Sequence, residues 1–292
     1  MGLVMLRIAI SVLVLIFSAI WSSAFIAAKV AVRDYDPFTV LAARFAIAAL
    51  VLGALVGVAR GEASRDTVET GILLGLLNNC AYLGLTFYAL NYISPVLVVV
   101  IVSCAPFLTI LISRFFASDT MSVRQTAGVA LGFLGVLVVT GIDLGAISNL
   151  EGVALALSGT ASFSLATVLF RARAQHYAIN QLNLWQSVTG AVVLTPAACL
   201  FGRPLIAPTI ESATAILYLA IVVTIGGMGL WLLLIRLTGA AKASSYHLLN
   251  PFFGVLLSAV VLKTPLRILD FAGAAIVASG LALVISSPMK KE

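Results

Sequence analysis

A run of 44 residues without one charged side chain lies between Glu69 and Arg114. The hydrocarbon core of a bilayer is about 30 Å thick, and a helix of about 20 apolar residues crosses it. The run therefore has room for two crossings. Its one turn-like segment, at 91–95 (Asn-Tyr-Ile-Ser-Pro), stands near the middle. This feature predicts a hairpin of two membrane helices.

The rest of the chain repeats the pattern, which predicts an all-α polytopic membrane protein in a lipid bilayer. With 62% hydrophobic and 10% charged residues, the composition excludes an ordinary soluble domain. The net charge of +6 is distributed among the loops, so we expect no nucleic-acid partner. The ten expected transmembrane helices are 8–28, 38–58, the two halves of the 70–113 run, 125–142, 152–170, 174–202, 212–235, 243–262 and 271–289.

The distribution of lysine and arginine over the two sides predicts the orientation. With ten crossings, eleven cations lie on the side of the termini and five on the other side, Arg44 being left out as intramembrane. Cytoplasmic loops carry the excess of Lys and Arg. We therefore expect both termini in the cytoplasm and the bacterial inner membrane as the location.

An internal repeat appears when the sequence is shifted by 145 residues. Pro106-Phe107 then falls on Pro251-Phe252 and Gly135 on Gly280, and eight of the thirty positions from 106 to 135 are identical. The alternative is a coincidence between helices of similar composition. Five helices per unit is an odd number, so the second unit enters the membrane from the other side. The pattern predicts two inverted units, 1–145 and 146–292, around a central cavity, which is a transporter architecture.

Pro106 and Pro251 fall near the middles of two expected helices. A proline inside a helix removes one backbone hydrogen bond and bends the helix. The two prolines are therefore predicted to act as kinks or hinges that shape the cavity, the alternative being bends that serve packing alone.

Several short motifs occur along the chain. The first half carries 21–25 (Trp-Ser-Ser-Ala-Phe), Lys29, Pro37, Arg44-Phe45, 88–92 (Tyr-Ala-Leu-Asn-Tyr) and Pro106-Phe107; the second half carries Trp231, Arg236-Leu237, 239–244 (Gly-Ala-Ala-Lys-Ala-Ser) and Pro251-Phe252.

As a set, these motifs resemble the drug/metabolite transporter superfamily, in its ten-helix EamA-type branch. The general look is that of the aromatic amino acid and methyl viologen exporters of the YddG type. The resemblance implies export of small metabolites, often amino acids, or of toxic organic compounds. The family often has a Gly-Glu pair after helices 4 and 9, where this chain has Ser118-Asp119 and Lys263-Thr264. That departure weakens any role for acids in those loops.

Polar residues inside the expected helices are the first candidates for a substrate site, because polar groups at membrane depth are costly. Asn78, Asn79 and Tyr82 share one helical face, and Ser244, His247 and Asn250 form a stripe on another helix. The alternative for the asparagines is hydrogen bonding between helices. His247 is either a proton carrier or a satisfied hydrogen-bonding group.

Aromatic, small polar and cationic residues extend this set of candidates. Each has a structural alternative, namely an interfacial anchor, close helix packing, or pairing of the cations with nearby acids. The further cavity candidates are Trp21, Ser22, Ser103, Ser162, Trp185 and Tyr246, with Trp231 next in line, and the cations near the outer face are Lys29 and Arg44.

No Asp or Glu lies in the middle of an expected helix. This disfavours proton-coupled export of lipophilic cations and favours a zwitterionic or weakly charged solute. Since the resemblance implies amino acids, we expect alternating-access export of aromatic or neutral amino acids that is uncoupled or weakly proton-linked. The open alternatives are an organic-cation exporter, a phosphorylated-metabolite exchanger and, remotely, an intramembrane enzyme. We expect a small-molecule substrate, no cofactor or metal, and a monomer or homodimer.

Overall fold

An apolar segment must satisfy its own backbone hydrogen bonds, because lipid offers no partner for exposed N–H and C=O groups. The computed structural model describes residues 2–58, 63–89, 91–93, 95–116, 121–141, 149–202, 209–263 and 267–286. Over these ranges the chain folds as helices joined by short connections, and it contains no strand. The predicted all-α class is confirmed for this part of the chain.

The helical segments follow one another with few residues between them. In chain order they are α1 (Gly2–Ala31), α2 (Pro37–Val58), α3 (Arg65–Gly75), the π-helical η1 (Leu76–Tyr82), α4 (Leu83–Ala89), α5 (Pro95–Val102), α6 (Ala105–Phe116), α7 (Val123–Thr140), α8 (Leu150–Leu169), the π-helical η3 (Phe170–Ala174), α9 (Ile179–Phe201), α10 (Ile210–Tyr218), the π-helical η4 (Leu219–Gly227), α11 (Met228–Thr238), α12 (Ala240–Ser244), the 3-10 segment η5 (Ser245–Leu249), α13 (Asn250–Leu262) and α14 (Ile268–Ser286).

Within the described ranges, eight helical passages are long and apolar enough to cross a membrane. Two other passages, α9 and the α12–η5–α13 segment, carry polar side chains such as Gln186 and His247. The eight assigned by length and composition are Ile8–Ala31, Pro37–Gly57, Arg65–Ala89, Leu97–Phe116, Val123–Thr140, Leu150–Ala174, Ile210–Thr238 and Ile268–Ile285.

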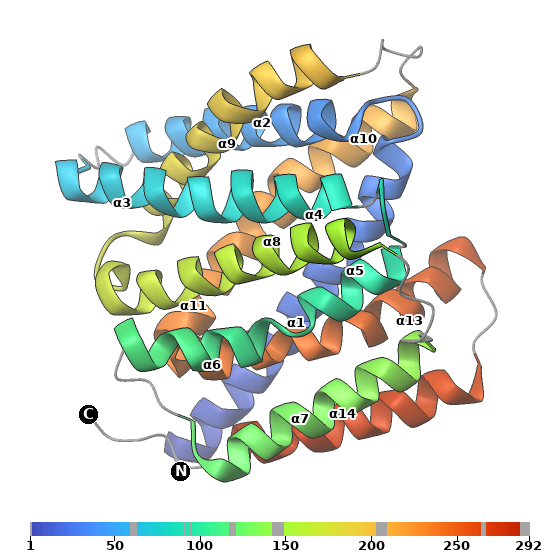
Figure 1. Ribbon diagram of the computed structural model, residues 1–292. Coiled ribbons are helices and arrows are strands. Elements are labelled where there is room, and N and C mark those ends of the chain that lie inside the picture. The colour runs from blue at the N-terminus through green and yellow to red at the C-terminus, as the bar shows by residue number, and fades with distance from the viewer. Residues whose placement is uncertain are drawn as a thin grey trace.

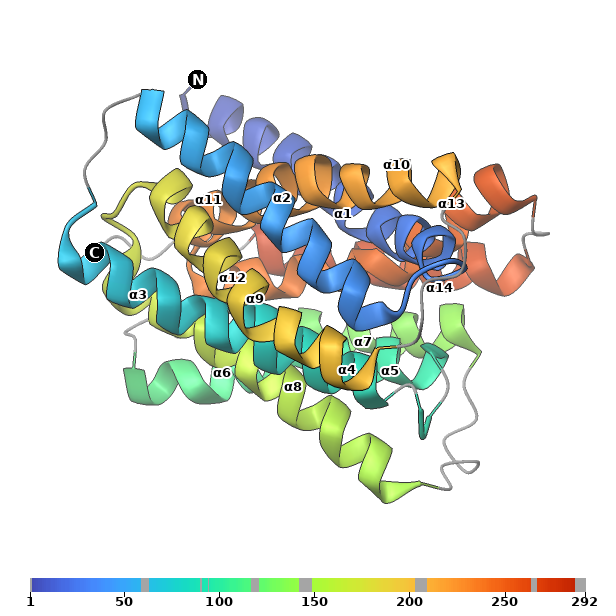
Figure 2. The same cartoon turned by 90° about the horizontal axis from the view of Figure 1, so that it is seen from above.

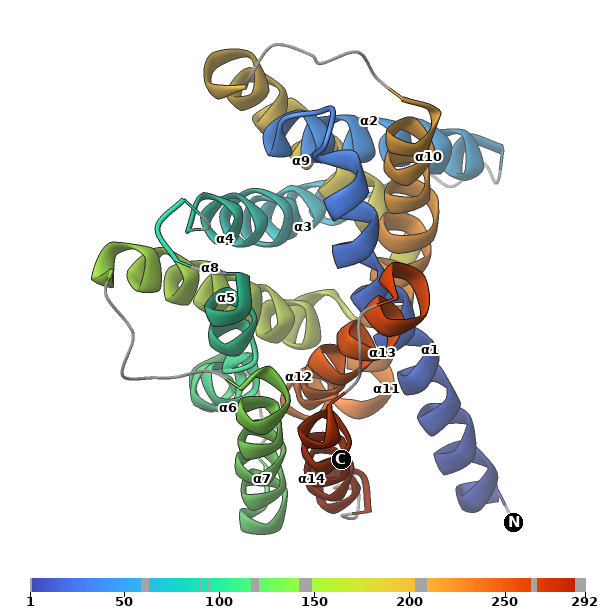
Figure 3. The same cartoon turned by 90° about the vertical axis from the view of Figure 1, so that its right-hand side faces the viewer.

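Most helices run side by side with their axes across the view of Figure 1. α2 packs along α9, and the two run side by side in the view of Figure 2. Seen nearly end-on in Figure 3, α7 and α14 form a pair at one edge of the bundle. α1 packs against α13 and α10, and α8 packs against α6 and α4.

Both prolines that were predicted as kinks stand at the start of a new helical piece. α5 ends before Ser103, and Pro106 lies in the first turn of α6. Pro251 lies in the first turn of α13, directly after η5. A first turn tolerates proline because the N–H there has no partner within the helix. A short turn at 103–104 thus precedes Pro106 and the 3-10 segment η5 precedes Pro251, and the role of the prolines as kinks or hinges stays a prediction.

The carbonyl before each proline is bound by a serine of a facing helix. Ser164 Oγ donates to the Ala105 carbonyl at 3.1 Å, and Ser22 Oγ donates to the Asn250 carbonyl at 3.0 Å. Each bond joins residues from opposite halves of the chain. The two breaks are therefore held by equivalent contacts.

Replacing both serines, as Ser22→Ala with Ser164→Ala, is expected to lower the free energy of unfolding by about 1 kcal/mol, since one hydrogen bond between membrane helices contributes about 0.6 kcal/mol. Reversible unfolding in mixed micelles would measure the change. Ser279→Ala is the control, because Ser279 Oγ bonds only within its own helix, to the Ala275 carbonyl. A double variant as stable as this control would contradict the prediction.

Candidate functional site

Four aromatic rings enclose the imidazole of His247. The ring centroids of Phe17, Trp21, Phe163 and Trp231 lie 5.2, 5.2, 5.1 and 4.6 Å from the centroid of His247. Phe17, Phe163, Trp231 and His247 are buried, and Trp21 is half-buried. These four rings from α1, α8 and α11 are called the aromatic cage below.

His247 is held inside the cage by one hydrogen bond. Its Nδ1 lies 2.8 Å from Nδ2 of Asn250, whose carbonyl accepts from Ser22. His247 Nε2 and Asn250 Oδ1 have no hydrogen-bond partner among the described residues. The imidazole therefore fills the centre of the cage.

Tyr82 links the cage to Arg44. The Tyr82 ring lies 4.9 Å from Phe163, and its phenol interacts electrostatically with the guanidinium of Arg44. Arg44 stands seven residues after Pro37 in α2, which corresponds to about 10 Å along the helix. Arg44 is half-buried, and its guanidinium carbon lies 5.1 Å from the centre of the Phe45 ring. The bundle therefore holds a cation well inside the membrane-spanning region.

Thr224 orients this cation. Arg44 Nε donates to Thr224 Oγ1 at 3.0 Å, and Thr224 Oγ1 donates in turn to the Leu219 carbonyl at 2.9 Å. In the described part of the chain, the two terminal nitrogens Nη1 and Nη2 of Arg44 have neither a hydrogen-bond nor an ion-pair partner. The Nε contact fixes the plane of the guanidinium and leaves its outer edge available.

Thr224 lies in the π-helical segment η4, and this local geometry explains why it can orient Arg44. A π-helical turn leaves backbone carbonyls poorly aligned with their own helix, and such turns are frequent at functional sites. Asn183 of α9 binds two of these carbonyls, with Nδ2 at 3.0 Å from Thr224 O and 3.3 Å from Ile225 O. α9 thus stabilises the segment that positions Arg44.

The π-helical segment η1 carries Asn78 and Asn79 and also faces α9. Asn79 Nδ2 donates to the Gln186 carbonyl at 2.8 Å, and Asn78 Nδ2 donates to Gln186 Oε1 at 2.9 Å. Ser162 Oγ donates to the Leu77 carbonyl at 2.9 Å from the α8 side. Both asparagines are buried, so their amide nitrogens join η1 to α9.

Five other expected site residues make no ring contact with the cage and no hydrogen bond to Arg44, Tyr82 or His247. They bond locally, are packed elsewhere or are exposed. Ser103 Oγ donates to Val99 O, Ser244 Oγ donates to Ala241 O, Tyr246 is fully buried, Trp185 packs on Gly71, and Lys29 is exposed.

Sequence reasoning overlooked Phe17, Phe163 and Thr224 as site residues. Phe17 stands four residues before Trp21, on the same helical face, which is a usable signal. Thr224 occupies the position of Asn79 after the shift of 145 residues, so the repeat itself points to it. Phe163 lies in an apolar helix among many similar residues, and no local pattern distinguishes it.

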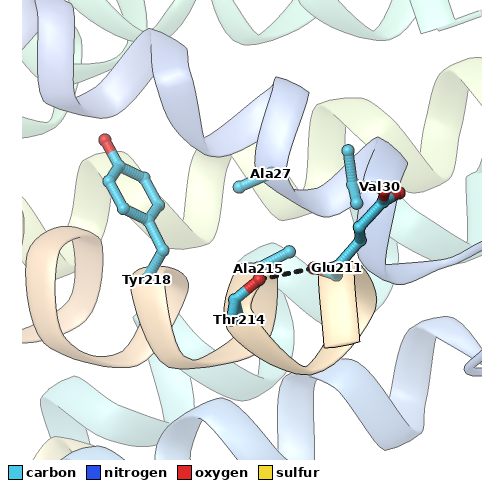
Figure 4. Close-up of a pocket in the computed structure, with 6 residues that line it drawn as sticks. All are labelled: Ala27, Val30, Glu211, Thr214, Ala215 and Tyr218. Carbon is cyan, nitrogen blue, oxygen red and sulfur yellow. Dashed lines mark hydrogen bonds between the residues drawn. The ribbon is translucent and has the colours of Figure 1, made fainter. Parts of the chain in front are cut away.

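Two shallow surface grooves lie away from the cage. The first, of about 490 Å³, runs between α1 and α10 (Figure 4). The Tyr218 hydroxyl on this side lies 2.7 Å from Ser23 Oγ. The second, of about 310 Å³, runs between α2 and α9. Both are open and mainly apolar, so we assign neither to the substrate. The first is lined by Ala27, Val30, Glu211, Thr214, Ala215 and Tyr218.

Asp34 fastens the loop after α1 to the start of α10. The Thr209 amide and hydroxyl donate to Asp34 Oδ2 at 3.0 and 2.7 Å. Hydrogen bonding from Ser212 and Thr209 holds the pKa of the Asp34 carboxyl below its usual value. The carboxylate is therefore engaged in a loop contact and in capping α10.

The sequence was compared with known families, curated proteins and solved structures. The profile of the EamA-like transporter family matches residues 8–141 and, a second time, residues 150–286. A protein of Escherichia coli named "Probable amino-acid metabolite efflux pump" is 26% identical over 92% of each chain. The "Uncharacterized transporter YoaV" of Bacillus subtilis is 24% identical over 90% of this chain and 91% of its own. A solved crystal structure with a TM-score of 0.76, at 19% identity, covers 94% of this chain and 96% of the other, and it has the same fold.

Proposed function

Because this chain belongs to the EamA-like transporter family, and is thus a multi-pass membrane transporter, we propose that it exports amino acids and their metabolites. In this proposal the substrate carboxylate binds Arg44, and an apolar or aromatic side chain lies beside Tyr82, Trp21 and Phe163. The single observation that carries the proposal is the oriented guanidinium of Arg44, which has no acidic partner among the described residues.

A cation at this depth needs a reason, because charged side chains inside a membrane are costly and are usually functional. A guanidinium binds a carboxylate through two parallel hydrogen bonds, which suits the free edge left by the Thr224 contact. Substrate binding would supply the anion that no described residue supplies. Relatives from Escherichia coli and Salmonella typhimurium carry the name "Probable amino-acid metabolite efflux pump", which supports this substrate class. The aromatic preference follows from the resemblance to the YddG type.

We further propose ten crossings in two inverted units, 1–145 and 146–292, that open the site alternately to each face. Three observations support this arrangement. The family profile matches the chain twice. Gly128 packs on Gly280 while Gly135 packs on Gly273, a pair of contacts that the 145-residue shift exchanges. The Ala105 and Asn250 carbonyls, which precede the two prolines and each accept from a serine, are also related by this shift. In this scheme α9 and the α12–η5–α13 segment are the remaining two crossings.

We propose that the chain lies in the inner membrane of a bacterial cell, as a monomer or homodimer. In this topology both termini are in the cytoplasm. The excess of Lys and Arg on the side of the termini supports this orientation. We also propose that transport is not coupled to protons. The enclosure of His247 among four rings supports that view, because proton exchange needs access to the imidazole.

The alternatives make different demands on the site. An organic-cation exporter needs an acid in the membrane, and an exchanger of phosphorylated metabolites needs several central cations. An intramembrane hydrolase built on Ser244 and His247 would need an acid that orients the histidine and a serine hydroxyl that donates to it. Ser244 Oγ instead donates to a carbonyl of its own helix. Counterflow distinguishes these classes, because each predicts a different labelled solute.

The experiment is counterflow uptake of labelled phenylalanine, leucine and N-acetylphenylalanine into proteoliposomes that contain this protein alone, with and without a pH gradient. We expect uptake of at least one carboxylate solute, independent of the gradient. Uptake of methyl viologen or a sugar phosphate alone would overturn the substrate class. Uptake that requires the gradient and is lost in His247→Ala would overturn uncoupled transport.

Thr224→Val is expected to raise KM about fivefold with little change in kcat, since the variant removes one hydrogen bond of about 1 kcal/mol that orients Arg44. Initial counterflow rates over a range of substrate concentrations measure both constants. The matched control is Thr189→Val, because Thr189 Oγ1 bonds to Trp185 O within its own helix. Equal effects of both variants would contradict an orienting role for Thr224.

A further inference from the structure

We infer that the transporter prefers organic monoanions, that is, deaminated or N-acylated amino-acid metabolites, over zwitterionic amino acids. This inference rests on the proposed function and sharpens its substrate class. It follows from an imbalance in the site, which offers a charged partner for a carboxylate and, among the described residues, no charged partner for an ammonium group.

The partner that the site offers to a carboxylate is Arg44. Its Nε is taken by Thr224, and its two terminal nitrogens have no described partner. The one titratable side chain that interacts electrostatically with it, within the described part of the chain, is the phenol of Tyr82. The positive charge is therefore neutralised by no carboxylate of the described chain and favours an anionic ligand.

The described residues offer no carboxylate that could pair with the ammonium group of a substrate. Six of the seven acids that the structure describes lie in connections or in the first turn of a helix, where the positive end of the helix dipole favours them. The seventh, Glu69, lies in the second turn of α3 and pairs with Arg65. Three others also have specific partners: Asp34 binds Thr209, Asp36 accepts from the Phe38 amide, and Asp270 pairs with Arg267. The remaining three are Asp66, Glu151 and Glu211.

The other acids of the sequence, Glu62, Asp119, Asp143 and Glu292, lie outside the described residues. By sequence they fall between or beyond the apolar stretches. None of the described acids is thus placed among the helix-centre residues that surround Arg44.

Aromatic faces are the other common partner of an ammonium group. In this protein the cage that could serve is occupied, because His247 stands at its centre within 4.6–5.2 Å of the rings. A zwitterion entering the site would lose the hydration of its ammonium without an ionic partner in return. Removing that ammonium, by deamination or acylation, removes the penalty and keeps the carboxylate.

A monoanion carries one charge across the membrane, so its uncoupled transport is electrogenic. A potential of 100 mV acts on one charge with a free energy equal to a concentration ratio of about 50-fold. An inside-negative membrane would thus drive such substrates out of the cell. Uncoupled transport of a zwitterion moves no net charge and does not respond to the potential.

The test uses three solutes with the same phenyl group in proteoliposomes of the full chain. N-acetylphenylalanine carries one negative charge, phenylalanine is a zwitterion, and phenethylamine carries one positive charge. Valinomycin with a potassium gradient sets the potential, and protein-free liposomes give the passive flux. We expect kcat/KM for N-acetylphenylalanine to exceed that for phenylalanine by about tenfold or more. We also expect its steady-state distribution to follow the potential, and Arg44→Gln to abolish the preference.

Several outcomes would overturn the inference. Phenylalanine transported as well as N-acetylphenylalanine would refute the charge preference while leaving amino-acid export intact. N-acetylphenylalanine flux that ignores the potential would refute electrogenic transport. Phenethylamine as the best substrate would refute both the inference and the proposed function, as would flux of none of the three from vesicles shown to hold folded protein.

Discussion

Arg44→Gln is expected to lower kcat/KM for carboxylate substrates by about 30-fold or more. The variant removes the charge that receives the substrate, and truncating one partner of a buried charge pair costs about 2 kcal/mol or more. The fold should tolerate the change, because Arg44 has no acidic partner among the described residues and a charge at this depth is itself costly. Counterflow kinetics and thermal unfolding, measured on the same preparation, separate the two effects.

The control for this variant is Lys29→Gln, which removes an exposed cation near the end of α1. Arg44→Lys is a second comparison, because lysine keeps the charge and loses the planar fork. We expect Lys29→Gln to behave as wild type and Arg44→Lys to lie between wild type and Arg44→Gln. If Lys29→Gln and Arg44→Gln reduce transport equally, the carboxylate does not bind at Arg44 specifically.

Gly280→Ala is expected to disrupt the α7–α14 pair and to lower the free energy of unfolding by about 3 kcal/mol. A Cβ on Gly280 would lie 2.5 Å from both the Gly128 carbonyl oxygen and the Gly132 amide nitrogen. Both atoms belong to backbone, so relief requires the helices to separate, and overpacking a tight contact typically costs about 1–3 kcal/mol. The thermal unfolding midpoint and the monodispersity of the purified protein report the loss.

Gly84→Ala is the matched control for the packing prediction. A Cβ on Gly84 meets no atom within 4 Å, and alanine has the higher helix propensity. This variant should therefore be as stable as wild type or slightly more stable. A Gly280→Ala protein that unfolds at the same temperature as Gly84→Ala would contradict the close contact of α7 with α14.

Much of the fold was predictable because the signals are local. A charge-free run must form a helix in lipid whatever its neighbours are, so the positions of α1, α2, α7, α8, α10–α11 and α14 follow from composition. The 145-residue shift places Gly128 on Gly273 and Gly135 on Gly280, and the structure packs these glycines between α7 and α14. The prolines marked the positions where a turn or a 3-10 segment precedes the next α-helical piece.

The candidate site was predictable only in part. Trp21, Tyr82 and His247 stood out as polar or aromatic residues in apolar helices, and they do meet near one cluster of rings. Asn78 and Asn79 carried the same signal, yet their amide nitrogens bind α9. An amide gives the same sequence pattern whether it lines a cavity or joins two helices, so its role depends on which helix it faces.

Sequence alone thus established that this chain is a bundle of apolar helices with an internal repeat, because hydropathy and residue spacing act within one segment. The tertiary structure decided which polar groups meet. Arg44 and Thr224 are 180 residues apart, and Phe17 and His247 are farther apart still. Their contacts depend on how α1, α2, η4 and η5 cross one another. Those crossings are set by close packing of many small residues, and no single stretch of sequence encodes them.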